Sequence, residues 1–133
     1  DGLVIYANER RDRESEIKNG VKVKGSTGVT FRRVKVSWTD PDAKTHGDYA
    51  VYPVFCKKVL VEGCDISGSS DAGIYVGQSK NIIVRNSTVK YNVAGIEIEN
   101  CYVADVYDNL ATHNTGGILV VPAWCRHVPQ PRI

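Results

Sequence analysis

The sequence lacks the features by which several large classes of protein are recognised. It contains no methionine, and no stretch approaches the roughly 18 consecutive apolar residues of a membrane-spanning helix. Its 17 basic and 15 acidic residues leave a formal net charge of +2, with no strongly basic stripe and no acidic tail. We therefore expect no membrane span and no nucleic-acid partner.

Metal-binding spacings are missing as well. The four cysteines, at positions 56, 64, 101 and 125, form no CxxC pair and no ligand pattern with the three histidines. Small thiols are common inside β structures, so we expect these cysteines to be free. The sequence thus predicts no metal centre.

Helical periodicity is absent, and a different repeat takes its place. Apolar residues spaced by three and four never persist along the chain, which excludes helical repeats. Instead, a short motif occurs three times, at residues 72–76, 94–98 and 116–120. Its central isoleucines, Ile74, Ile96 and Ile118, are 22 residues apart. A fixed period of this size marks an architecture in which each repeat buries its apolar face against its neighbours.

Each copy of the motif has the pattern of a β-strand, because apolar residues alternate with other types. A second alternating run follows, in which Ile82 and Val84 are matched 22 residues later by Ala104 and Val106. Two or more short strands per repeat, joined by Gly, Asn and Ser turns, are what a parallel β-helix requires. The sequence therefore predicts an all-β parallel β-helix of about four to five coils with a period of about 22 residues.

The chain is short enough for one domain, in which we expect three parts. Residues 1–19 are expected to be irregular apart from the remains of a strand at their start. Residues 20–121 should form the coils, with a loop inserted at residues 37–49, and residues 122–133, with three prolines, an irregular tail. Because the first residues show neither an initiator methionine nor a signal-peptide pattern, we expect a fragment or a mature piece and not a complete translation product.

Stacking the coils assigns side chains to the inside or the outside of the solenoid. Three inward ladders are expected: Tyr52, Ile74, Ile96 and Ile118; Val54, Val76, Ile98 and Val120; and Val61, Val84 and Val106. Residues between the first two ladders should point outward, which gives one exposed row: Pro53, Tyr75, Glu97 and Leu119.

Polar residues also fall in register between coils. Expected pairs at the turns are Gln78 with Asn100, Asn86 with Asp108, and Ser87 with Asn109. Asn and Asp tolerate the left-handed backbone conformation and bond neighbouring backbone groups, so we assign these pairs a structural role. Arg85 beside Glu62 is expected to form an exposed ion pair.

The best candidate site lies on the predicted outer row. Glu97 and Glu99, two residues apart on one strand, should stand about 6.6–7 Å apart at the backbone. Inverting glycosidases place their two carboxyl groups about 6.5–9.5 Å apart, so this pair suits acid–base work on a glycosidic bond. Tyr75, one coil below, is the third candidate catalytic residue. Candidate substrate-binding residues around them are Asp71, Gln78, His113 and Trp38.

Plainer explanations exist for the same residues. An outward glutamate on a solvated strand needs no function, His113 has the setting of a surface residue, and Trp38 has that of an anchor for the inserted loop. No cofactor is expected. Calcium is the one alternative, although it needs more oxygen ligands than the Glu97 and Glu99 pair supplies.

The three motif copies, with their flanks at residues 68–78, 92–100 and 114–120, resemble bacterial right-handed parallel β-helix repeat proteins of the pectate-lyase-like superfamily. The resemblance covers about residues 20–120 and implies a right-handed coil, a secreted, periplasmic or extracellular protein, and a polysaccharide partner. Because members of the superfamily are usually much longer, it also implies that this chain is a central fragment. The superfamily's catalytic signatures are incomplete here. Residues 40–42, Asp-Pro-Asp, lack the histidine of the epimerase motif, and residues 45–47, Thr-His-Gly, match only part of the polygalacturonase motif. No counterpart of the pectate-lyase calcium site and arginine base is found.

Two hypotheses of function follow from the residues and the resemblance. In the first, the chain acts on or binds an acidic polysaccharide, and any enzyme activity would be that of a lyase, an epimerase or a glycoside hydrolase. In the second, it is a noncatalytic β-helix that serves as a scaffold or a polysaccharide-binding module. Alanine at both Glu97 and Glu99 separates them, because only an enzyme has turnover to lose. Open end coils carry unpaired strand edges, so we also expect end-to-end self-association.

Overall fold

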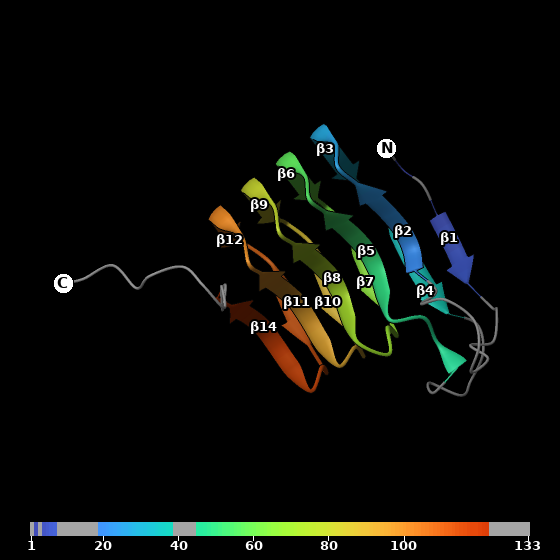
Figure 1. Ribbon diagram of the computed structural model, residues 1–133. Coiled ribbons are helices and arrows are strands. Elements are labelled where there is room, and N and C mark those ends of the chain that lie inside the picture. The colour runs from blue at the N-terminus through green and yellow to red at the C-terminus, as the bar shows by residue number, and fades with distance from the viewer. Residues whose placement is uncertain (1, 3, 8–18, 39–44, 123–133) are drawn as a thin grey trace.

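The chain winds into a parallel solenoid with three faces. The computed structural model describes residues 2, 4–7, 19–38 and 45–122. Over these ranges its strands form three sheets, which we name A, B and C, and every strand pairing is parallel (Figure 1). Each full coil contributes one strand to each sheet in the order B, C, A. The parallel β-helix expected from the 22-residue period is thereby confirmed.

The strands of the three sheets have the following bounds. Sheet A holds β1 (Val4–Ala7), β4 (Lys35–Trp38), β7 (Asp65–Ser67), β10 (Thr88–Lys90) and β13 (Leu110–Thr112). Sheet B holds β2 (Asn19–Lys24), β5 (Tyr49–Val54), β8 (Ala72–Gly77), β11 (Ala94–Glu99) and β14 (Gly116–Val121). Sheet C holds β3 (Thr27–Arg32), β6 (Lys57–Glu62), β9 (Lys80–Arg85) and β12 (Tyr102–Tyr107).

The segment boundaries differ in places from those expected. β1 confirms a strand at the start of the chain, inside the segment that was otherwise expected to be irregular. The inserted loop is shorter than residues 37–49, because Ser37 and Trp38 belong to β4 and Tyr49 begins β5. Residues 39–44 and the tail from residue 123 onward lie outside the described part, so the expectations for them are not tested. Within the described ranges, no helix is long and apolar enough to cross a membrane.

The core consists of aliphatic ladders, one residue per coil, with rungs about 4.8 Å apart. Ile74, Ile96 and Ile118 form one ladder as expected, and Val61, Val84 and Val106 form another. Each buried aliphatic side chain contributes about 1.5–3 kcal/mol relative to exposure, so these ladders are the main source of stability. They also explain the alternation of the sequence, because every second residue of a strand points into the solenoid.

The expected ladders are wrong in β5. Val51, not Tyr52, pairs with Ile74, and Val54 pairs with Gly77. Pro53, expected in the exposed row, is among the fully buried side chains. The cause is one extra residue in the turn after β7. This turn has four residues, 68–71, whereas the corresponding turn of the next coil has three, 91–93. A shift of one residue moves every side chain of a strand to the opposite face.

The corners of the solenoid use left-handed backbone at corresponding positions of successive coils. Gln78 and Asn100 share one corner with φ of 45° and 53°, and Asn86 and Asp108 share another with φ of 52° and 53°. These pairs confirm the polar stacking expected at the turns. Next to the second corner, the Asn109 side chain accepts a hydrogen bond from the Ser87 backbone N–H at 3.0 Å. The third corner carries Gly68, Tyr91 and His113, whose φ values are also positive.

Val103 occupies a left-handed position that suits a β-branched residue poorly. Its φ is 56°, and the corresponding positions of the preceding coils hold Lys58, Asn81 and, in β3, Gly28. Non-glycine residues in this region are strained by about 1–2 kcal/mol, with Asn among the best tolerated. Val103→Asn should therefore raise the free energy of unfolding by about 1 kcal/mol, measured by urea denaturation. Asn81→Val should lower it, and no change in either variant would contradict the strain.

The C-terminal coil leaves part of its inward face uncovered. Val120 is 74% exposed, whereas Ile98 in the preceding coil of the same ladder is 3% exposed. Among the residues that the structure describes, each strand of this coil has a neighbour on one side only. Such edges favour addition of another β-strand, and the end-to-end self-association expected from the sequence stays a prediction.

Candidate functional site on the outer face of sheet B

Carboxylates and tyrosines gather on the outer face of sheet B, where β5, β8 and β11 lie side by side (Figure 1). Glu97 on β11 pairs with Tyr75 on β8, and Tyr52 on β5 occupies the next position of the same row. We call this surface the acid–tyrosine face; its residues are Asp48, Tyr49, Tyr52, Asp71, Tyr75, Glu97 and Glu99. Asp48 and Asp71 belong to it because each directly precedes a sheet B strand.

The three tyrosines pack into one cluster. Tyr75 stacks on Tyr49 with ring centroids 4.5 Å apart, and Tyr52 meets Tyr75 edge-on at 5.1 Å. Ala72 and Ala94 lie beside them, and their small side chains leave room for the rings. Tyr75 is therefore only 7% exposed, so the expectation of an exposed Tyr75 was wrong. The half-buried rings of Tyr49 and Tyr52 form the accessible aromatic surface.

A glycine directs Tyr75 toward a carboxylate. A Cβ atom on Gly77 would lie 2.6 Å from the Tyr75 ring, so only glycine leaves the ring room to lie across this position. Gly77 pairs with Glu99 on β11, and the Tyr75 hydroxyl donates a hydrogen bond to Glu99 Oε2. Tyr75 is thus placed to orient the Glu99 carboxylate.

Burial and mutual repulsion raise the proton affinity of this face. Burial raises the pKa of Glu97, and the charges of Asp71 and Glu99 add to the effect. The pKa of Asp71 is raised by burial and by the nearby charges of Asp48 and Glu99, with a hydrogen bond from Tyr49 opposing the shift. Burial, followed by the contact with Glu99, raises the pKa of Tyr75, so the phenol stays protonated. Carboxyl groups tuned in this way occur often at catalytic sites.

A family model described as "Right handed beta helix region" matches residues 1–123. The chain belongs to the right-handed β-helix family. No curated protein and no solved structure matches it. The family identity agrees with the stacked parallel sheets and gives the hand of the coil expected from the resemblance.

The β-helix brings together five of the seven candidate residues predicted from sequence. Asp71, Tyr75, Glu97 and Glu99 share the acid–tyrosine face, and Gln78, directly after β8, hydrogen-bonds to Tyr75. His113 instead lies exposed at the corner between sheets A and B, where its ring is 5.3 Å from that of Tyr91.

Trp38 does not lie on the acid–tyrosine face. It ends β4 in sheet A, packs against the core, and stacks on His46 of the inserted segment at 5.8 Å. His46 Nδ1 lies 2.5 Å from the Gly68 carbonyl oxygen. Trp38 is therefore an anchor for this segment, the plainer of its two predicted roles.

Three residues of the face were not predicted from sequence: Asp48, Tyr49 and Tyr52. Asp48 and Tyr49 lie in the segment that was expected to be an inserted loop, so no strand position was assigned to them. The wrong register expected for β5 placed Tyr52 on the inner face. Asp48 is held in place by a hydrogen bond of 2.9 Å that Ser70 Oγ donates to its Oδ1. One signal in the sequence could have placed Tyr52 correctly. Val59 and Ile82 are 23 residues apart, and the same offset puts Tyr52 in register with Tyr75.

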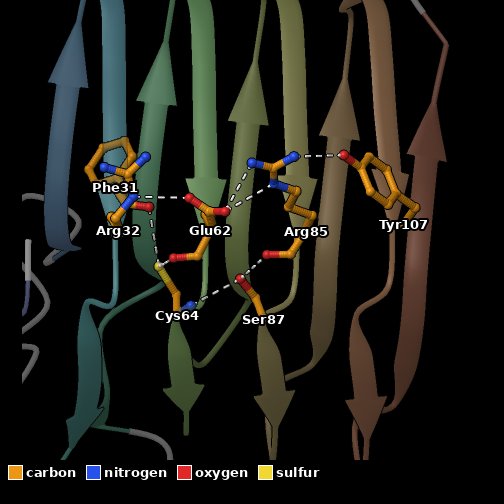
Figure 2. Close-up of polar contacts among 7 residues, drawn as sticks. All are labelled: Phe31, Arg32, Glu62, Cys64, Arg85, Ser87 and Tyr107. Carbon is orange, nitrogen blue, oxygen red and sulfur yellow. Dashed lines mark hydrogen bonds and ion pairs between the residues drawn. The ribbon is translucent and has the colours of Figure 1, made fainter.

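Polar contacts on sheet C form a second, structural ladder (Figure 2). Glu62 Oε2 accepts a hydrogen bond from Arg32 Nε at 3.0 Å, and Glu62 Oε1 lies 3.0 Å from Arg85 Nη2. Arg85 Nη1 in turn donates to the Tyr107 hydroxyl at 3.1 Å. The predicted pair of Arg85 and Glu62 is confirmed, and the contact with Arg32 lowers the pKa of Glu62.

The three described cysteines, Cys56, Cys64 and Cys101, are free as expected. Figure 2 places the Cys64 thiol near the Phe31 carbonyl, and the Cys64 N–H donates to Ser87 Oγ at 3.1 Å. Among the described residues, no group of three or more His, Cys, Asp or Glu side chains is arranged to hold a metal ion. The expectation of no cofactor, with calcium as the one alternative, stays a prediction.

The raised carboxyl pKa values predict how stability changes with pH. When the pKa of a carboxyl group is higher in the folded than in the unfolded state, the folded state binds its proton more readily, and acidification stabilises it. The stabilisation begins as pH falls through the raised pKa values of Asp71 and Glu97 and is complete below their unfolded values. Glu62 has the opposite effect on stability. Its pKa is lowered in the folded state, so the stability contributed by its charged form is lost on acidification.

Removing one of these two half-buried charges should therefore stabilise the protein at neutral pH. We expect Asp71→Asn to raise the free energy of unfolding by about 0.5 kcal/mol at pH 7, a small value because solvent partly screens the group. The gain should shrink toward pH 4. Urea denaturation at both pH values measures it, with Asp105→Asn on the exposed part of sheet C as the control. A loss of stability at pH 7 would contradict the assigned repulsion.

Proposed function

We propose that the acid–tyrosine face binds a polysaccharide and hydrolyses its glycosidic bonds. The observation that carries this proposal is the position of Glu97. Its carboxyl group has a raised pKa, lies two residues from Glu99 on the same side of β11, and adjoins a tyrosine cluster. Glycoside hydrolysis needs two carboxyl groups with different protonation, and aromatic rings commonly pack against the apolar faces of sugars.

Glu97 acts as the general acid and Glu99 as the general base. Glu97, whose raised pKa favours its protonated form, donates its proton to the glycosidic oxygen as the bond from that oxygen to the anomeric carbon breaks. Glu99, oriented by the Tyr75 hydroxyl, accepts a proton from the water that attacks the anomeric carbon from the opposite side. Residues i and i+2 of a strand are about 6.6–7 Å apart at the backbone, and carboxyl groups that keep this separation leave room for that water, as in inverting glycosidases. Tyr75 acts here as a positioning residue.

Charge bears on which polysaccharide fits this face. The charges of Asp48 and Glu99 help to raise the pKa of Asp71, and those of Asp71 and Glu99 help to raise the pKa of Glu97, so the four carboxyl groups lie close together. A uronate residue bound among them would add a further negative charge and be repelled. The face therefore favours a neutral glycan over the acidic polysaccharide expected from the sequence.

A panel assay tests the proposal. Purified protein is incubated with neutral, amino-sugar and uronate polysaccharides, and new reducing ends and unsaturated products are measured together. We expect new reducing ends from a neutral glycan, no unsaturated product, and an inverted anomeric centre by proton NMR. Unsaturated product would identify a lyase instead. Binding without any turnover, by protein with an intact β-type circular dichroism spectrum, would establish the noncatalytic binding module and overturn the proposed hydrolysis.

A further inference from the structure

A groove lies at the corner between sheets A and B, beside the acid–tyrosine face. Its volume is about 490 Å³, and residues from three successive coils line it. We propose that this groove is a second glycan subsite that holds one pyranose ring. The inference rests on the proposed function, because the groove and the face would bind the same extended chain.

One wall of the groove carries two exposed rings. Tyr91 is 61% exposed, and its ring centroid lies 5.3 Å from that of His113 in the next coil. Both residues occupy the left-handed corner position, with φ of 58° and 54°, so they recur at the same place in successive coils. Gly68 takes the equivalent position in the preceding coil, where the rings of His46 and Trp38 pack against it.

The opposite wall comes from the turn with the extra residue. Residues 68–71 connect β7 to β8, and Ser69 and Ser70 both line the groove. Ser69 is only 3% exposed, yet its buried Oγ has no hydrogen-bond partner among the residues that the structure describes. A buried hydroxyl without a hydrogen-bond partner costs about 1–3 kcal/mol. The Ser69 hydroxyl therefore indicates a ligand group that supplies the missing hydrogen bond.

The lining defines the chemical class of the ligand. Rings and the Val93 side chain offer an apolar surface, whereas Ser69, Ser70 and Thr115 offer hydroxyl groups. Within the described part of the chain, the groove lining carries no carboxylate, lysine or arginine, and His113 is its one ionisable side chain besides the Tyr91 phenol. An uncharged molecule with an apolar face and several hydroxyl groups matches these walls, and a pyranose ring is such a molecule.

The groove is joined to the acid–tyrosine face through the same turn. Ser70, which lines the groove, donates its hydrogen bond to Asp48, and the next residue, Asp71, faces Glu97. A glycan chain that crosses this turn would place one sugar in the groove and a later one at the carboxylates. The groove should therefore strengthen binding of long chains and leave short ones unaffected.

Affinity measured against chain length tests the inference. Wild-type protein and three variants are titrated by NMR with neutral hexose oligosaccharides of two to eight units, taken from the glycan that the panel assay selects. Tyr91→Ala removes the groove ring, Tyr52→Ala removes a ring of the acid–tyrosine face, and Tyr102→Ala is the control. Tyr102 matches Tyr91 because it is 62% exposed but lies on sheet C. We expect Tyr91→Ala to weaken binding of the longest oligosaccharide about 10-fold, the disaccharide not at all, with Tyr102→Ala unchanged.

Each other result has a definite meaning. If Tyr52→Ala weakens binding and Tyr91→Ala does not, the groove is not a subsite and the proposed function stands. If only Tyr91→Ala weakens binding and no glycan is cleaved, the groove is a binding site and the hydrolytic function of the face is overturned. If folded wild-type protein binds no glycan of the panel or series, both are overturned.

Discussion

Replacing Ile96 with aspartate should leave no folded protein at 25 °C. Ile96 is fully buried in β11, between Ile74 and Ile118 of the same ladder. Losing such a side chain costs about 2–5 kcal/mol, and placing an unpaired carboxylate in the core costs several more. Since a domain of this size is stable by about 5–15 kcal/mol in total, the substitution removes most or all of it.

Circular dichroism and a thermal melt measure this effect. The Ile96→Asp variant should lose the β-type spectrum and show no cooperative transition. Val103→Asp is the matched control, because Val103 is 67% exposed on β12 and its left-handed backbone accepts aspartate. A soluble Ile96→Asp variant with the wild-type melting curve would refute the inward assignment of the isoleucine ladder.

The fold was predictable because it depends on a period and not on details of packing. Each coil repeats the same strand pattern, so Ile74, Ile96 and Ile118 determine the stacking direction by themselves. The error in β5 has a local cause. Residues 49–54 are apolar or aromatic throughout, so no alternation marks the inner face, and a proline is an unusual inward residue. The length of one turn then decided which side chains point inward.

The candidate site was predictable in part for the same reason. Glu97, Glu99 and Tyr75 lie on copies of one motif, so their common face follows from the period alone. Tyr49 and Tyr52 also pack against Tyr75. Their positions depend on the length of the turn at residues 68–71 and on where the inserted segment ends, and no local sequence pattern specifies either. His113 lies apart from them because a turn residue lies at a corner, where the direction of its side chain depends on the left-handed backbone.

Replacing Glu97 with glutamine should reduce turnover by about 100- to 10,000-fold, the usual contribution of a general acid. Glutamine keeps the size of the side chain but has no acidic proton to transfer, so turnover should fall while substrate affinity changes little. The measurement is kcat and KM on the neutral glycan that the panel assay selects. Asp105→Asn, on the exposed part of sheet C, is the control with a lost carboxylate and no expected effect.

The pH profile distinguishes an acid catalyst from a structural residue. Because burial and the charges of Asp71 and Glu99 raise the pKa of Glu97, wild-type activity should fall as pH rises through that value. The residual activity of Glu97→Gln should lack this fall on the alkaline side. The variant should also be at least as stable as the wild type at pH 7, since it removes a repelled charge. An active variant with an unchanged pH profile would exclude Glu97 as the acid, and lost activity together with lost stability would assign it to the fold.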